Sequence, residues 1–108
     1  MLIEHRTYTL KPGKVGEYLR NYGEAGFALH EGHLGNCVGQ YTSEAGRLNQ
    51  IIALWQFDDW TQRMERKARL DADPRWQKLL NEGLAPLVTS IETSIATPTP
   101  MWRPKWLP

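Results

Sequence analysis

The feature that most constrains the fold is a short polar segment, residues 43–50, between two strand-like runs. Turn-forming and charged residues interrupt the hydrophobic pattern there, and Asn49 and Gln50 lead back into an apolar run. Runs of this composition on either side of a turn are typical of β-strands. Because the connection is short, we expect the two strands to pair antiparallel as a hairpin.

The rest of the chain shows hydrophobic patterns of both periods, two residues for strands and 3.6 for helices. The predicted elements are a strand at 2–10, a helix from 14 to about 30, strands at 34–42 and 49–57, a helix from about 60 that restarts at 73–74 and ends at 83, and a strand from 87 to about 96. The second helical region is expected to turn Trp60, Met64 and Ala68 inward and its basic residues mostly outward.

This order of elements predicts an α+β, ferredoxin-like βαββαβ domain. Right-handed crossovers then give one four-stranded antiparallel sheet, in the order 4-1-3-2, with the helices on one face. We assign residues 1–97 to this domain and residues 98–108 to a tail rich in Pro and Trp. Its prolines exclude regular helix or sheet, and we expect it to pack on a dimer.

Alternation along the first strand divides its side chains between the two sheet faces. We place Ile3, His5, Thr7 and Thr9 under the helices, together with Asn49, Ile51, Ala53, Trp55 and Phe57 of the third strand. The other face would carry Glu4, Arg6, Tyr8 and Leu10, with Ile52 and Leu54. Such a mixed face suits a partner better than solvent, so we expect a homodimer formed through the sheets, with Arg6 paired to Glu92.

Composition excludes several classes of protein. A chain of 108 residues fits one domain, and a net charge of +1 provides no field for nucleic acid or an acidic membrane surface. The single cysteine, Cys37, excludes an internal disulfide. No apolar run approaches the ~20 residues of a membrane span. Because a strand is expected to begin at Leu2, we predict no targeting segment and a cytoplasmic location.

Several segments resemble the NIPSNAP family. They are Glu4-His5-Arg6-Thr7-Tyr8-Thr9-Leu10-Lys11-Pro12-Gly13-Lys14, His33-Leu34-Gly35 with Gly39, Leu48-Asn49-Gln50 through Leu54-Trp55, Arg63, and Ala72-Asp73-Pro74-Arg75-Trp76. The resemblance implies the dimeric α/β-barrel superfamily, in which two ferredoxin-like subunits pair by their sheets and each can hold a small ligand between sheet and helices. Its members include haem-degrading and quinone-forming monooxygenases and lactone isomerases.

The expected ligand pocket lies between the sheet and the helices. Small side chains leave space, and a few polar groups converge on it, as in many small-molecule sites. The candidate lining residues are Thr7, Tyr22, Asn49, Ala53 and Trp55, with Arg63 reaching the mouth to hold a carboxylate. The alternative is that the lining residues simply fill the core and that Arg63 belongs to a solvated basic face of its helix, with Arg66, Lys67 and Arg69.

Histidines are candidates for moving a proton, because the imidazole titrates near neutrality. His5 is expected in the pocket. One of His30 and His33, at the surface or the pocket mouth, could also be a general base, and the resemblance favours His33. We predict no metal site, because His30, Glu31 and His33 are expected to flank Gly32 in a loop and lack a further ligand at known spacing.

The leading functional hypothesis is a cofactor-independent monooxygenase or isomerase acting on a small aromatic or lactone-like molecule. One alternative is a protein that binds or senses a small apolar ligand, or haem, without chemistry. Another is a purely structural dimer. Nucleic acid and membranes are not expected as partners.

Overall fold

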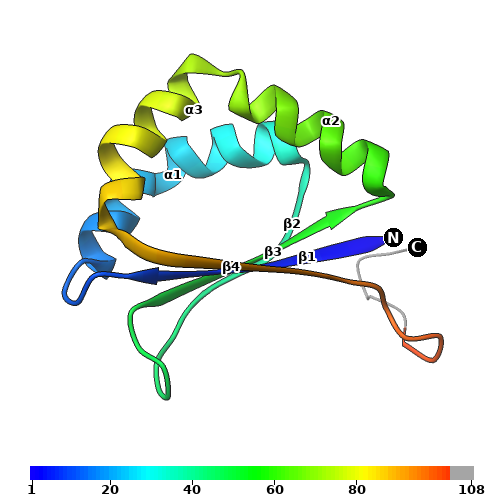
Figure 1. Ribbon diagram of the computed structural model, residues 1–108, viewed down its shortest axis with the longest axis horizontal. Helices are drawn as coiled ribbons and strands as arrows, with labels where there is room; N and C mark the ends of the chain where they lie inside the picture. The colour runs from blue at the N-terminus through cyan, green and yellow to red at the C-terminus, as the bar shows by residue number, and fades with distance from the viewer. Residues whose placement is uncertain (103–108) are drawn as a thin grey trace.

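The computed structural model describes residues 1–102 and has the expected order of elements (Figure 1). The strands β1 (Leu2–Leu10), β2 (Asn36–Thr42), β3 (Gln50–Phe57) and β4 (Val88–Ala96) form one antiparallel sheet, in the order β2-β3-β1-β4. The helices α1 (Val15–Leu34), α2 (Trp60–Asp71) and α3 (Pro74–Leu79) all cover the same sheet face (Figure 1). The predicted ferredoxin-like fold and strand order are therefore confirmed.

The connection from α3 to β4 contains more helical turns than expected. The helical region predicted to end at Gly83 continues instead as a π-helical turn, η1 (Leu80–Leu84), and a 3-10 turn, η2 (Ala85–Leu87). Asp59 and Asp73 cap α2 and α3, since their side chains accept hydrogen bonds from the backbone N–H of Gln62 and Arg75.

Helix α1 is kinked at Gly23, whose φ of 50° and ψ of −173° belong to a region open essentially to glycine alone. One turn later, a β-carbon at Gly26 would lie 2.9 Å from the Leu79 side chain, so glycine allows α1 and α3 to approach closely. The helix extends to Leu34, so His30 and His33 lie within α1. Their placement in a loop was wrong.

The predicted face of β1 was also wrong. Glu4 lies opposite Trp55 in the sheet, Arg6 opposite Ala53, and Tyr8 opposite Ile51. Residues opposite one another in an antiparallel ladder share a face. The even-numbered residues of β1 therefore lie under the helices with the odd-numbered residues of β3, which were placed correctly.

The reversal removes the predicted pair of Arg6 and Glu92. Glu92 lies opposite Thr7, on the face without helices, whereas Arg6 lies under them. The uncovered face still carries partly exposed Ile52 and Leu54, and the exposed Tyr41 lies opposite Ile52.

Most of the tail lies outside the described residues. Residues 97–102 follow β4 without regular structure. The expected packing of the tail on a dimer stays a prediction, because residues 103–108 lie outside the described range. None of the helices within residues 1–102 combines the length and apolarity needed to cross a membrane.

Candidate functional site

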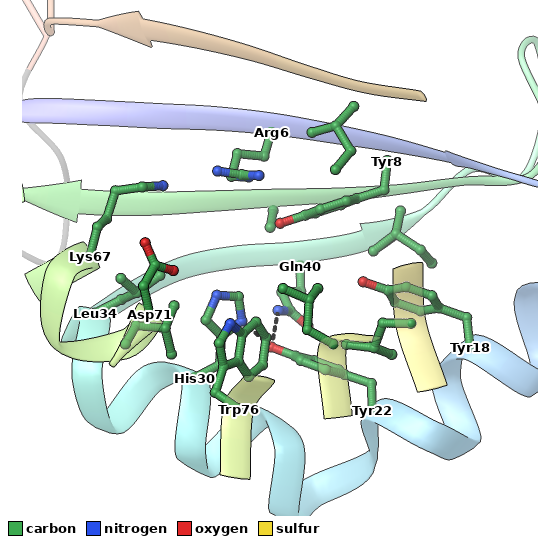
Figure 2. Close-up of a pocket in the computed structure, with 16 residues that line it drawn as sticks. Arg6, Tyr8, Tyr18, Tyr22, His30, Leu34, Gln40, Lys67, Asp71 and Trp76 are labelled. Atoms are coloured by element: carbon green, nitrogen blue, oxygen red, sulfur yellow. Dashed lines mark hydrogen bonds between the residues drawn. The ribbon is translucent and has the colours of Figure 1, made fainter. Parts of the chain in front are cut away.

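A cavity of about 180 Å³ lies between the sheet and the helices (Figure 2). Arg6 and Tyr8 project into it from the sheet, while Tyr18, Tyr22 and His30 project from α1. We call this space the helix–sheet cavity. Its further lining residues are Leu34, Gln40, Ile51, Ala53, Lys67, Leu70, Asp71, Trp76, Leu80, Leu84 and Ile91.

The cavity extends toward the edge strand β4. A shallower depression of about 370 Å³ shares Tyr8, Tyr18 and Ile91 with it and continues along residues 88–90. The rings of Tyr8 and Tyr18 lie 6.4 Å apart, and the side chain of Ile91 is half exposed. The cavity and the depression therefore adjoin at Tyr8 and Tyr18, near the open edge of the sheet.

A hydrogen-bonded chain crosses the aromatic wall. Gln40 donates to the Tyr22 hydroxyl over 3.1 Å, and that hydroxyl lies 2.8 Å from Nδ1 of His30. If Tyr22 donates, His30 carries its proton on Nε2 and can donate to a ligand there. If Nδ1–H donates to Tyr22, Nε2 is an acceptor. Either tautomer fixes the ring through Nδ1 and leaves Nε2 for chemistry.

His30 is held between two indole rings. Its ring centre lies 4.3 Å from that of Trp76 and 4.5 Å from that of Trp55. Burial lowers the pKa of His30 to about 3, and the nearby charges of Arg6 and Lys67 act in the same direction. His30 is therefore a neutral imidazole at physiological pH.

A buried carboxylate lies next to the cavity. Glu4 is fully buried and contacts three cations, Arg63 at 2.5 Å and Arg6 and Lys67 at 3.4 Å each. We call these four residues the Glu4 cluster. Burial raises the pKa of Glu4, but the hydrogen bond from Arg63 and the three positive charges outweigh it and lower the pKa overall.

The cations of this cluster carry a surplus of positive charge. Burial and the adjacent Arg6 lower the pKa of Lys67, with Glu4 opposing them. For Arg6, burial also disfavours the charge, but Tyr8 and Glu4 outweigh burial and raise the pKa. Arg6 lies over the Tyr8 ring, 5.3 Å from its centre, and its Nε atom is buried without a hydrogen-bond partner among the described residues.

The structure places some predicted ligand-binding residues at the cavity and others beside it. Tyr22 and Ala53 line it. Trp55 is fully buried behind the wall, against His30, and its indole N–H has no partner among the described residues. Arg63 does not reach the mouth, because it holds the Glu4 carboxylate instead.

The other candidates lie elsewhere. His5 is exposed and Thr7 lies beside it on the uncovered sheet face, because the face of β1 is reversed. Asn49 adopts a positive φ of 61° in the hairpin, where its carbonyl accepts from Leu10 N–H. His33 lies near the end of α1, with Nε2 2.8 Å from the Asp73 carboxylate.

Sequence reasoning missed Arg6, Tyr8, Lys67 and Trp76 as lining residues of one cavity, and it expected His30 in a loop at the surface or the pocket mouth rather than in the cavity wall. A signal for His30 was available: Tyr18, Tyr22, Gly26, His30 and Leu34 recur at every fourth position, which places them on one helical face. A signal for Lys67 was its spacing of four from Arg63, since both reach the same carboxylate.

Comparison with known proteins identifies the family. The family model described as NIPSNAP matches residues 3–103. The chain belongs to the NIPSNAP family. NipSnap homolog 3A of Homo sapiens is 36% identical over 79 residues, which cover 72% of this chain and 31% of the human protein. The NipSnap homolog of Dictyostelium discoideum is 32% identical over 95 residues, which cover 88% of this chain and 41% of the Dictyostelium protein. This NIPSNAP chain thus spans less than half the length of these relatives.

Solved structures agree with this assignment. Protein Atu4242 of Agrobacterium tumefaciens superposes with a TM-score of 0.89 at 39% identity, covering 94% of this chain and 96% of its own. A NIPSNAP-like domain protein of Burkholderia xenovorans superposes with a TM-score of 0.90 at 30% identity, covering 95% of this chain and 89% of its own. An antibiotic biosynthesis monooxygenase superposes with a TM-score of 0.62 at 12% identity, covering 93% of this chain and 100% of its own. This similarity shows a shared fold alone.

Proposed function

We propose that this NIPSNAP protein binds a small, planar, mostly aromatic molecule in the helix–sheet cavity and acts on it without a cofactor, as a monooxygenase or isomerase. The observation that carries the proposal is the cavity itself, with apolar and aromatic walls around a few convergent polar groups. A filled interface between helices and sheet would have favoured a structural role. The fold shared with an antibiotic biosynthesis monooxygenase makes oxygenation the first reaction to test.

The polar groups of the cavity suit chemistry that begins with removal of a substrate proton. Arg6 and Lys67 would stabilise the enolate or phenolate formed, because cations already fixed in a partly buried site need little reorganisation. His30, in the tautomer with a free Nε2, would take the proton. Its low pKa makes it a weak base in the empty cavity, and the negative charge forming beside it offsets that weakness.

Binding without chemistry is the second candidate, and the size of the cavity limits its ligand. A volume of about 180 Å³ is below the ~300–1,000 Å³ of sites for drug-sized molecules. It suits a single ring. A porphyrin is too large for it. The described residues therefore do not fit haem.

The test is to fill the cavity. Ala53→Leu should abolish binding of single-ring aromatic compounds by titration calorimetry, and abolish oxygen uptake with dihydroxybenzenes or turnover of a lactone. Ala68→Leu, on the exposed side of α2, is the matched control and should change neither. Binding without turnover would leave the second candidate. If the unmodified protein binds no single-ring compound, the proposal is wrong.

We also propose that two copies pair through the uncovered sheet faces. Ile52 and Leu54 lie on that face with Tyr41, and no helix among residues 1–102 covers them. Light scattering should give a dimer, and Ile52→Arg should give a folded monomer, whereas Thr93→Arg on the exposed edge strand should not. A monomer of the unmodified protein at micromolar concentration would contradict this. A cytoplasmic location stays a prediction from the sequence.

A further inference from the structure

We infer that the ligand of the helix–sheet cavity is an anion, a carboxylate on a single planar ring, with its carboxylate held between Arg6 and Lys67. This rests on the proposed function, because it specifies the chemical class of molecule that the same cavity takes. It goes beyond that function in requiring a negative charge on the molecule as it arrives, before any reaction.

The first argument is the balance of charge. The Glu4 cluster contains three cations and one carboxylate, and the three basic side chains are each largely buried. Among the described residues the acidic side chain that lines the cavity is Asp71, which is exposed at the surface of α2 and makes no ion pair within 4.0 Å. Two positive charges are therefore left over in a partly desolvated place, where an unpaired charge is costly.

The second argument is that the three cations make different contacts with Glu4 and with the cavity. Arg63 takes the short contact with Glu4, at 2.5 Å, and does not line the cavity. Arg6 and Lys67 do line it, and their contacts with Glu4 are long, at 3.4 Å each. Together with the unpartnered Nε of Arg6, this leaves N–H donors of both side chains for a second carboxylate.

The third argument is shape. The walls beside these cations are the rings of Tyr18, Tyr22 and Trp76, and the volume of about 180 Å³ suits one ring with a small substituent. His30 is neutral and also faces this space, so it adds a hydrogen-bonding group and no negative charge. An aromatic or cyclic carboxylate matches both the walls and the cations, whereas a neutral ring of equal size matches only the walls.

The experiment compares two probes of nearly equal shape, benzoate and benzamide, by titration calorimetry on the unmodified protein. Benzoate should bind at least about tenfold more tightly, because a hydrogen bond to a charged group is stronger than one to a neutral group. Lys67→Gln should weaken benzoate by about tenfold and benzamide little. Arg69→Gln removes the same charge from the exposed surface of α2 and should leave both affinities within about twofold.

The outcomes separate the two proposals. Equal affinities for benzoate and benzamide, with binding blocked by Ala53→Leu, would overturn the inference and leave the proposed function standing. Binding of neither probe at millimolar concentration would overturn both for single-ring molecules. Because the comparison of the two probes uses the unmodified protein, it decides the question even if Lys67→Gln does not fold.

Discussion

Helices α1 and α2 cover the same face of the sheet but meet it with different chemistry. Helix α1 turns a column of mostly aromatic and aliphatic residues inward, at every fourth position from Tyr18 to Leu34. Helix α2 buries only Leu70 fully, turns Arg63 and Lys67 toward the sheet, and leaves Trp60 and Met64 exposed. One helix packs by hydrophobic contact and the other largely by ion pairs.

The difference follows from what lies beneath each helix. Under α1 are Tyr8 and Ile51, which apolar and aromatic side chains cover well. Under α2 is Glu4, which is fully buried and is stable as a carboxylate only with cations nearby. The buried acid therefore fixes the rotation of α2. Hydrophobicity alone would instead turn Trp60, Met64 and Ala68 toward the sheet. The cavity lies where the two environments meet.

The largest expected effect comes from removing the acid. Glu4→Gln leaves Arg6, Arg63 and Lys67 close together without their counter-ion, and should lower the free energy of unfolding by about 3–5 kcal/mol. Urea denaturation measures the loss. Glu65→Gln removes a carboxylate from the exposed side of α2 and should change stability by no more than about 0.5 kcal/mol. Equal, small changes in both variants would show that the Glu4 cluster does not orient α2.

The fold was predictable from the sequence because it depends on signals that are local. The bounds of β1 are those predicted, and the two capping aspartates begin α2 and α3 where expected. The family resemblance and the strand order agreed with these signals. Each signal requires only residues close together in the chain, such as a turn, a cap or a repeated apolar position.

The site was less predictable because it depends on pairs distant in the chain. The assigned face placed Glu4 and Arg6 away from the core, in agreement with the usual tendency of charged residues. Arg63 and Lys67, about sixty residues later, reverse that tendency. Leu2 and Leu10 are even-numbered like Glu4, so they share its face of the strand, and both are buried. The apolar residues at the two ends of the strand therefore indicated the correct face.

An intermediate effect is expected from His30 of α1, which should make the stability of the protein depend on pH. The pKa of His30 is about 3 in the folded protein, against 6.5 for an ordinary histidine. Between these values the unfolded chain binds a proton that the folded protein does not, so stability falls as the pH falls below 6.5. At about pH 5 the loss should be roughly 2 kcal/mol relative to neutral pH.

Chemical denaturation across this range measures the slope. Glu4 does not contribute to it, because its pKa is lowered from 4.5 and its stabilisation is lost only at more acidic pH. His30→Gln should flatten the slope between about pH 5 and 6.5, where the His30 shift acts. A slope that survives His30→Gln would show that this imidazole is not buried as a neutral group.

The smallest expected effect tests the rotation of α2 from its outer side. The Met64 side chain is 67% exposed, so Met64→Gln should change the free energy of unfolding by no more than about 0.5 kcal/mol. If α2 instead turned Trp60, Met64 and Ala68 toward the sheet, the same change would bury an unpaired amide in place of a thioether and cost about 1–3 kcal/mol. Urea denaturation of this one variant therefore distinguishes the two rotations. The near-neutral result would show that α2 does not turn its most hydrophobic stripe toward the sheet, in agreement with the contacts that Arg63, Lys67 and Leu70 make there.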